Sequence, residues 1–439
     1  MTQVITLGCR LNHAESDTIA RALEGAGDLV VINSCAVTQE AVRNTRQAIR
    51  RAHRDRPGAR IVVTGCAAEV ERESFEAMPE VAQVVANSDK LTIPSSRRKP
   101  GSQDERTPAP SRVETQSIAG VTEPDFVASF DSRTRAFVAV QNGCDHRCTF
   151  CIIPYGRGPS RSIPAGMVVD GIKRLVDQGC AEIVLTGVDV TSYGPDLPGS
   201  PTLGLLVERI LRHVPRLQRL RLSSLDSVEI DDRLMDVITG EPRFMPHLHM
   251  SFQSGDDLIL KRMKRRHSRA QAIETVQRIK AARPEVAIGA DLIAGFPTET
   301  EPMHANSLDL INECGIVHAH IFPYSPRPGT PAARMPQVNG AVIKTRAQAL
   351  REAAARRRSA WLQSLVGSRQ RVLWEQGGLG HIESFAPVRL ARSPSSRRTP
   401  GSQAGESRQA NLDPGFRRDD LNTVHITGVD NNVLIGVPA

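Results

Sequence analysis

The chain has 439 residues and a mass of 47.8 kDa, which is too long for one ordinary domain. With 40% hydrophobic and 24% charged residues it is not a disordered chain, and no apolar run reaches the roughly 18 residues that span a membrane. The N-terminus lacks the features of a signal peptide, and eight cysteines are too few for a disulfide scaffold. We therefore expect a cytoplasmic protein whose net charge of +8 favours an anionic partner.

The first 92 residues alternate apolar runs with helical patterns. We expect helices over residues 14–23 and 41–53, and strands in the apolar runs Val4–Leu7, Leu29–Ile32 and Ile61–Thr64. Continuous apolar runs are typical of strands that are buried on both faces of a parallel sheet. The strand–helix–strand order therefore predicts a doubly wound α/β domain over residues 1–92.

Residues 93–130 have the composition of a linker. The Ser-, Arg- and Pro-rich stretch PSSRRKPGSQ (94–103) recurs almost unchanged as PSSRRTPGSQ (394–403). Repeats of a solenoid are adjacent, so this widely separated pair does not indicate one. We interpret the pair as two copies of one inserted element in solvated loops, with two basic RNA-binding arms as the alternative.

The β/α alternation resumes from residue 131 and continues to residue 365. Six strands are predicted, and helices are predicted between them, for example over 164–177, 203–213, 269–282 and 301–313, followed by a long helix over 341–365. Six βα units are fewer than the eight of a closed barrel, so we expect an open, partial (β/α)6 barrel with its chemistry at the C-terminal strand ends. The predicted strands are 137–141, 182–186, 220–224, 247–252, 286–293 and 317–323.

The pattern after Gly367 is that of strands alone. We expect strands over 371–374, 381–390, 424–426 and 433–437, which form a small all-β module over residues 366–439 with an insert at 392–420. We also expect truncation after Leu365 to spare the chemistry of the barrel, whose predicted site residues all lie earlier in the chain.

A C-x₃-C-x₂-C run follows the first predicted barrel strand. Cys144, Cys148 and Cys151 lie within eight residues of one loop, so three thiolates can face one iron–sulfur cluster. Because only three ligands are supplied, one iron keeps an open position for a substrate or cofactor. A structural zinc ion would need a fourth ligand, and the spacing of His146 inside the loop suits that role poorly.

Three further cysteines follow the predicted strands of the N-terminal domain. Cys9, Cys35 and Cys66 end the runs VITLGC, VVINSC and IVVTGC. Because the carboxyl ends of parallel strands share one edge of a sheet, these cysteines are expected to converge there. The spacing alone leaves two interpretations open. The three cysteines could hold a second cluster, or they could be small buried residues of the core. Cys180 and Cys314 fit neither set, and we expect them in the core.

With both cysteine sets in place, the chain resembles the radical S-adenosylmethionine methylthiotransferases. The resemblance extends over nearly the whole chain apart from the inserts, and the final β module is similar to the TRAM RNA-binding domain. Eight short segments carry the resemblance. They are TLGCRLN (6–12), VINSCAVT (31–38), VVTGCAAE (62–69), GCDHRCTFCIIPYGRGPSRS (143–162), LTGVDVTSYG (185–194), FQSGDD (252–257), LIAGFPTETE (292–301) and FPYSPRPGTPAARM (322–335).

The resemblance implies two 4Fe-4S clusters and S-adenosylmethionine as cofactors. Cys144, Cys148 and Cys151 would hold the catalytic, radical-generating cluster, and Cys9, Cys35 and Cys66 an auxiliary cluster. The expected reaction is methylthiolation of C2 of N6-threonylcarbamoyladenosine beside the tRNA anticodon. Isopentenyladenosine in tRNA, or an aspartate of a small-subunit ribosomal protein, is the alternative substrate.

Residues at the C-terminal strand ends are expected to contact S-adenosylmethionine. The expected partners are the tRNA anticodon loop and a reductant such as flavodoxin or ferredoxin, with no membrane and with a monomeric state. An electron carrier, or an RNA-binding protein with structural clusters, remains open as a different class of protein. The predicted cofactor-binding residues are Gly187, Asp189, Ser224, Gln253, Asp291 and Gly295.

Overall fold

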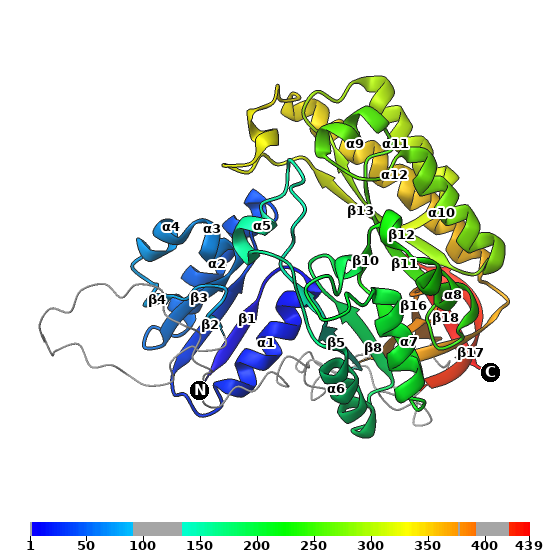
Figure 1. Ribbon diagram of the computed structural model, residues 1–439, viewed down its shortest axis with the longest axis horizontal. Helices are drawn as coiled ribbons and strands as arrows, with labels where there is room; N and C mark the ends of the chain where they lie inside the picture. Colours follow the sequence, from blue (N-terminus) through cyan, green and yellow to red (C-terminus); the bar gives the residue numbers. More distant parts are fainter. Residues whose placement is uncertain (1, 91–133, 376–377, 392–420) are drawn as a thin grey trace, which may run out of the picture. The chain divides into compact units, whose positions relative to one another are not determined.

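The structure is a computed structural model that describes residues 2–90, 134–375, 378–391 and 421–439 (Figure 1). It forms two compact units. The first contains Met1–Ser129, Gly143–Asp145 and Cys151–Pro159, and the second contains Phe130–Asn142, His146–Phe150 and Ser160–Ala439. The cysteine-rich loop is thus divided between the units. The linker predicted over 93–130 and the insert predicted at 392–420 both lie outside the described residues.

The first unit is built on a parallel sheet with the strand order β1-β2-β3-β4. Every residue of β2 is buried, as its unbroken apolar run predicts. Helix α2 begins at Thr38, whose hydroxyl accepts a hydrogen bond from the amide of Ala41. The strands are β1 (Gln3–Thr6), β2 (Leu29–Ser34), β3 (Arg60–Gly65) and β4 (Gln83–Val84), and the helices are α1 (Arg10–Ala22), α2 (Gln39–Asp55), α3 (Cys66–Val70), α4 (Arg72–Glu76) and α5 (Ile153–Arg157).

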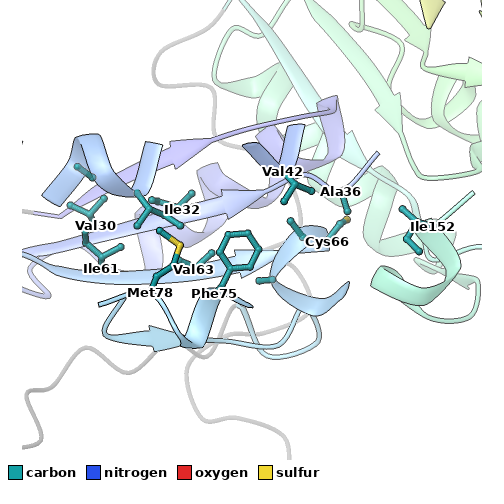
Figure 2. Close-up of a cluster of buried hydrophobic side chains, with 14 residues drawn as sticks. Val30, Ile32, Ala36, Val42, Ile61, Val63, Cys66, Phe75, Met78 and Ile152 are labelled. Carbon is teal, nitrogen blue, oxygen red and sulfur yellow. The ribbon is translucent and has the colours of Figure 1, made fainter. Parts of the chain in front are cut away.

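Alternate side chains of the central strands fill two hydrophobic clusters. Val31 packs in one cluster with Ile19 of α1. Val30 and Ile61 pack in the other with Val42 of α2, and this cluster continues to Ile152 (Figure 2). Successive strand residues point to opposite faces, so α1 and α2 cover the two sides of the sheet. The predicted α/β architecture is confirmed.

The second unit begins with the predicted partial barrel. Two parallel sheets, β5-β8-β9 and β10-β11-β12-β13, are joined by an isolated parallel bridge between Leu220 and Phe244. A short antiparallel pair, β6 (Gln141–Asn142) with β7 (Arg161–Ser162), lies next to the cysteine-rich loop in sequence. The barrel strands are β5 (Arg135–Ala139), β8 (Glu182–Thr186), β9 (Arg219–Leu222), β10 (Ser224–Leu225), β11 (His247–Gln253), β12 (Ala287–Ala294) and β13 (Ile316–Pro323).

Helices connect the barrel strands at the positions that the sequence predicts. Ser268 and Gln271 form a capping box at the start of α10, and the Asp256 carboxylate accepts amide hydrogen bonds at the start of α9. Three short 3₁₀ helices cover 190–192, 227–229 and 331–334. The helices are α6 (Ala165–Asp177), α7 (Leu203–His213), α8 (Asp232–Gly240), α9 (Asp257–Met263), α10 (Arg269–Ala282), α11 (Glu301–Glu313) and α12 (Gly340–Ser364).

The C-terminal β module is a closed five-stranded barrel around the fully buried Trp374, consistent with a TRAM-like domain. The single strand predicted over 381–390 is wrong, because the chain turns at Phe385 and forms two strands there. The strand order is β14-β15-β16-β18-β17, and the strands are β14 (Arg369–Trp374), β15 (Leu379–Ile382), β16 (Pro387–Leu390), β17 (Leu421–Asp430) and β18 (Val433–Pro438).

Phe385 of this turn packs against the barrel. Its ring lies 5.2 Å from the guanidinium carbon of Arg135 on β5 and 5.0 Å from that of Arg221 on β9. The ring also stacks on His247 of β11 at 5.1 Å and meets His318 of β13 edge to face. Side chains from four barrel strands reach one ring only on the concave face, so Phe385 forms the floor of the barrel.

Buried arginines of the barrel strand β9 bind the β module. Arg219 donates to the carbonyl of Arg371, and Arg221 donates to those of Ile382 and Glu383. Arg221 also pairs at 3.0 Å with the fully buried Glu182. The module therefore supplies hydrogen-bond acceptors of barrel arginines, which argues against the expectation that truncation after Leu365 would spare the barrel.

Candidate functional site

The three N-terminal cysteines lie at one edge of the sheet. Cys9 and Cys35 follow β1 and β2, and Cys66 begins α3 directly after β3. Gly8 has φ of +104°, and a Cβ built on it would lie 2.9 Å from the Cys35 sulfur, so the close approach requires glycine. Burial, followed by the neighbouring Cys66 and Cys9, raises the pKa of Cys35 to about 11. The structure thus brings the three thiols together, as their positions predict.

A buried charged network adjoins these thiols. The Arg157 Nε donates to the Cys66 sulfur at 3.2 Å, and its terminal nitrogens donate to Glu15 at 2.7 and 3.1 Å. Lys90 pairs with the same carboxylate at 2.5 Å. Burial alone would raise the pKa of Glu15, but the charges of Arg157 and Lys90 outweigh it and lower that pKa to about 2. Sequence spacing gives no sign of this network, because its members lie far apart in the chain.

Asn12 connects the network to a second thiol. Its amide donates to the carbonyls of Leu7 and Ser34, which fixes the side chain between β1 and β2. Its carbonyl oxygen accepts from Arg157 and lies 3.7 Å from the Cys9 sulfur. Arg157 therefore contacts Cys66 directly and reaches Cys9 through Asn12.

The segment that carries Arg157 is packed into the first unit. Ile152 lies in the hydrophobic cluster beside Cys66 (Figure 2), and a Cβ on Gly156 would be 3.3 Å from the Cys66 carbonyl. The Asn87 side chain donates to the Gly156 carbonyl at 2.7 Å. The Cys144 amide donates to the Gly158 carbonyl, so Cys144 belongs to the same packed segment.

The middle of the cysteine-rich loop is anchored in the second unit. The amide and hydroxyl of Thr149 donate to the carbonyls of Met263 and Arg262, and its carbonyl accepts from Ala332. The Arg265 guanidinium lies 3.8 Å from the Cys148 sulfur and donates to Asp226 at 2.9 Å. A cation therefore adjoins a predicted cluster ligand in this unit as well.

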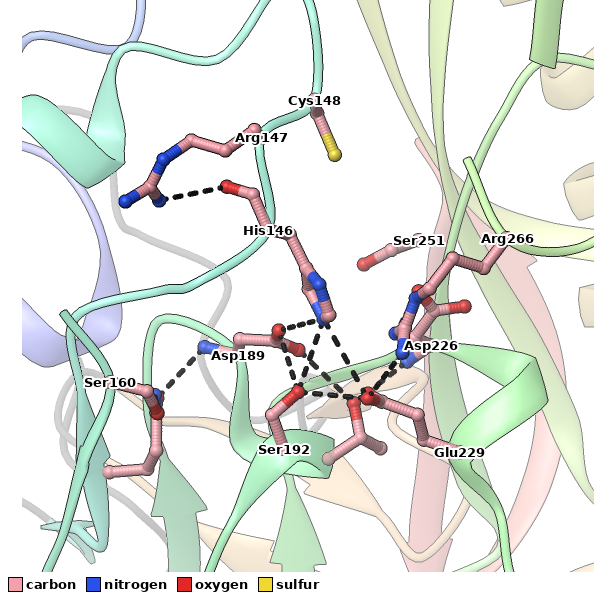
Figure 3. A network of polar contacts seen from close by, with 12 residues as sticks. His146, Arg147, Cys148, Ser160, Asp189, Ser192, Asp226, Glu229, Ser251 and Arg266 are labelled. Carbon is pink, nitrogen blue, oxygen red and sulfur yellow. Dashed lines mark hydrogen bonds and ion pairs between the residues drawn. The ribbon is translucent and has the colours of Figure 1, made fainter. Parts of the chain in front are cut away.

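His146 binds an acidic pair from the C-terminal strand ends (Figure 3). Its Nε2 lies 2.9 Å from Asp189 and 3.6 Å from Glu229, and 3.2 Å from the Ser192 hydroxyl. Hydrogen bonds to Asp189 and then Glu229 raise the pKa of His146 to about 10, so this ring is an imidazolium at neutral pH. The ion pairs hold the loop near the strand ends.

Four of the predicted cofactor-binding residues lie at or just after the C-terminal ends of barrel strands, namely Gly187, Asp189, Gln253 and Gly295. Gly187 and Asp189 follow β8, where the Gln141 side-chain oxygen accepts from the Asp189 amide. Gln253 ends β11 with φ of +66°, Gly295 follows β12 with φ of +71°, and the exposed Ser224 begins β10. Their role remains a prediction.

Asp291 lies within β12 in a polar layer with two histidines. Its Oδ1 is 2.8 Å from the Nε2 of His249 and 3.1 Å from the Nδ1 of His320. His249 and His320 lie two residues after His247 and His318, on the same side of their strands, so the layer faces the barrel interior above the Phe385 floor. His320 keeps 61% of its side chain exposed.

The usual ligands of an iron–sulfur cluster are cysteine thiolates, so each set of three cysteines supplies the kind of ligand that a cluster needs. One cysteine of each set also has a cation beside its sulfur, Arg157 beside Cys66 and Arg265 beside Cys148. Cys180 and Cys314 are almost fully buried in the second unit, apart from both sets, as predicted.

Comparison with known families agrees with this two-part architecture. Residues 138–311 match the radical SAM superfamily, and residues 1–87 match the uncharacterized protein family UPF0004. The barrel and its cysteine loop therefore define a radical S-adenosylmethionine enzyme. None of the described helices is long and apolar enough to cross a membrane.

Individual relatives indicate which family of radical S-adenosylmethionine enzymes the chain belongs to. Threonylcarbamoyladenosine tRNA methylthiotransferase of Rickettsia prowazekii is 47% identical over 88% of this chain and 91% of its own length. The enzyme of that name from Bacillus subtilis is 38% identical over 75% of this chain and 74% of its own length. The tRNA-2-methylthio-N(6)-dimethylallyladenosine synthase of Paracoccus denitrificans is 31% identical over 99% of this chain and 96% of its own length. The chain belongs to the radical S-adenosylmethionine tRNA methylthiotransferase family.

Proposed function

We propose that this chain transfers a methylthio group to C2 of N6-threonylcarbamoyladenosine in the tRNA anticodon loop. Besides the relatives, one observation supports this substrate, the inward-facing layer of His249, Asp291 and His320. Imidazole and carboxylate groups can bind the hydroxyl, amide and carboxylate of a threonylcarbamoyl group. An isopentenyl group offers no such partner, and a buried polar group without one costs about 1–3 kcal/mol.

The two cysteine sets are proposed to hold the cofactors. Cys144, Cys148 and Cys151 hold the cluster that binds S-adenosylmethionine, and Cys9, Cys35 and Cys66 hold the auxiliary cluster. When bound, the first cluster with S-adenosylmethionine supplies a radical strong enough to act on the unactivated C2–H bond. The chain positions the loop through His146 and Thr149, and Gly187, Asp189, Ser224, Gln253 and Gly295 offer the surface for S-adenosylmethionine.

The remaining partners follow from this chemistry. The radical reaction needs an electron donor, and a flavodoxin or ferredoxin is the proposed reductant. The net charge of +8 suits a tRNA partner, since phosphate contacts provide most of the affinity for nucleic acids. We propose a monomer that acts in the cytoplasm, where tRNA is modified.

Turnover on matched tRNAs tests the substrate. The tRNAs carry threonylcarbamoyladenosine, isopentenyladenosine or unmodified adenosine at the same position, and a small-subunit ribosomal protein serves as a fourth candidate. Methylthiolation of the threonylcarbamoyl tRNA is expected to dominate, because the other substrates lack the polar substituent that the layer can hydrogen-bond. Preference for the isopentenyl tRNA or for the protein would contradict the proposal.

Replacing His320 tests the layer itself. We expect His320→Phe to lower kcat/KM for the threonylcarbamoyl tRNA by roughly tenfold to a hundredfold, the value of a hydrogen bond to a charged group. The isopentenyl tRNA should lose little. His320→Gln keeps a hydrogen-bonding side chain and should recover part of the loss. Equal losses on both tRNAs in His320→Phe would show that His320 does not select the substituent.

A further inference from the structure

Arg157 is an unusual group to find beside a cluster ligand. Only 1% of its side chain is exposed, and it donates to the Cys66 sulfur while its other nitrogens bind Glu15 and Asn12. Burying a guanidinium is costly unless it is paired and hydrogen-bonded. This arrangement fixes the guanidinium against the sulfur.

Three charged side chains beside Cys66 carry a net positive charge among themselves. Arg157 and Lys90 are two cations that share the carboxylate of Glu15, and all three side chains are at least 96% buried. Arg157 binds Glu15 at 2.7 Å with one terminal nitrogen and directs its Nε at the Cys66 sulfur at 3.2 Å. The positive charge in excess of Glu15 is therefore directed at the cysteines.

A cluster bound to these cysteines supplies the missing negative charge. A four-iron cluster held by three thiolates is negatively charged when oxidised and more so when reduced, so a fixed cation favours the reduced form. We propose that Arg157 is a positioning residue that holds Cys66 and raises the reduction potential of the auxiliary cluster, with Lys90 and Glu15 setting the net charge around it. This inference rests on the proposed assignment of Cys9, Cys35 and Cys66 as cluster ligands.

The place of Arg157 in the chain extends its role. It ends α5, six residues after Cys151, and this whole segment packs against α3, which begins with Cys66. A rigid five-residue helix therefore connects a ligand of the radical-generating cluster with the cation beside the auxiliary cluster. Folding of α5 onto the first unit places both groups at once.

Redox titration of the auxiliary cluster alone tests the proposal. In full-length protein with Cys144, Cys148 and Cys151 changed to Ala, the remaining cluster is followed by electron paramagnetic resonance against applied potential. Arg157→Gln should make the potential more negative by more than about 59 mV, a tenfold change in a one-electron equilibrium. Arg157→Lys keeps the charge and should shift it less.

Charge-matched variants separate electrostatics from packing. The double variant Glu15→Gln with Lys90→Met removes one charge of each sign and leaves Arg157, so its shift should be smaller than that of Arg157→Gln. Arg46→Gln, which breaks a partly exposed pair with Glu71 in the same unit, should leave the potential unchanged.

Two results would overturn the proposal. One is an unshifted potential in Arg157→Gln, and the other is a shift in the double variant as large as in Arg157→Gln. If Arg157→Gln loses its iron, the iron content of Arg157→Lys becomes the test. Loss of iron from folded Arg157→Lys as well would mean that the shape of the arginine side chain matters and not its charge, which would contradict the proposal. Absence of iron from the parent lacking Cys144, Cys148 and Cys151 would instead contradict the ligand assignment of the proposed function.

Discussion

Replacing Cys9, Cys35 and Cys66 together with Ala is expected to remove about half of the iron from anaerobically reconstituted protein, because each set of three cysteines suits one cluster. Methylthiolation should fall below detection. Reductive cleavage of S-adenosylmethionine should continue, because it depends on Cys144, Cys148 and Cys151. Iron analysis and assays of 5′-deoxyadenosine and modified tRNA measure the three quantities.

The reciprocal variant and a matched control complete this experiment. Changing Cys144, Cys148 and Cys151 to Ala should also remove about half of the iron but should abolish the cleavage. Changing Cys180 and Cys314, two buried cysteines outside both sets, should leave the iron content unchanged. Full retention of iron without Cys9, Cys35 and Cys66 would contradict the auxiliary cluster.

The parts of this site that could be predicted from sequence are those with a local signal. Cysteines at fixed spacing, or directly after an apolar run, are visible because one strand or loop carries the pattern. The helices over 203–213, 269–282 and 301–313 match their predicted bounds because their polar and apolar residues alternate with helical period.

The charged network beside Cys66 has no local signal. Glu15 lies 142 positions from Arg157 and in a different helix. The residues next to each of them in the sequence do not distinguish it from a charged residue on a solvated helix face. The sequence predicts only part of the polar layer of His249, Asp291 and His320 in the barrel. The alternation of His247 with His249 and of His318 with His320 puts each pair on one face of a strand, but the sequence does not show that Asp291 joins the two strands.

The contacts between the β module and the barrel also have no local signal. The sequence RLRL of β9 alternates arginine with leucine, which is typical of a strand with one solvated face. Arg219 and Arg221 are in fact 0% and 2% exposed. Their partners are carbonyls of a module that begins about 150 residues later in the chain. No spacing rule relates backbone carbonyls to a distant side chain.

Truncation after Leu365 is therefore expected to unfold the barrel rather than to spare its chemistry. Without the module, Arg219 and Arg221 lose their carbonyl acceptors, and Arg135 loses its 2.7 Å pair with Glu375. The three arginines would then share the one carboxylate of Glu182, and each lost hydrogen bond to a charged group costs about 1.5–3 kcal/mol, which in sum is comparable with much of the stability of a domain. The truncated protein should be insoluble or should lack both cooperative unfolding and S-adenosylmethionine cleavage.

A single substitution of Phe385 separates the loss of stability expected on truncation from the loss of an RNA-binding surface. Phe385→Ala removes the ring that Arg135, Arg221, His247 and His318 contact, and should lower the free energy of unfolding by about 3 kcal/mol. The native φ of +71° at Phe385 is itself unfavourable by about 1–2 kcal/mol, which the packing of the ring offsets. Arg389→Gln, which breaks an exposed pair with Asp430 elsewhere in the module, should change stability by less than about 0.5 kcal/mol. A soluble truncated protein that still cleaves S-adenosylmethionine would show that the barrel folds without this floor.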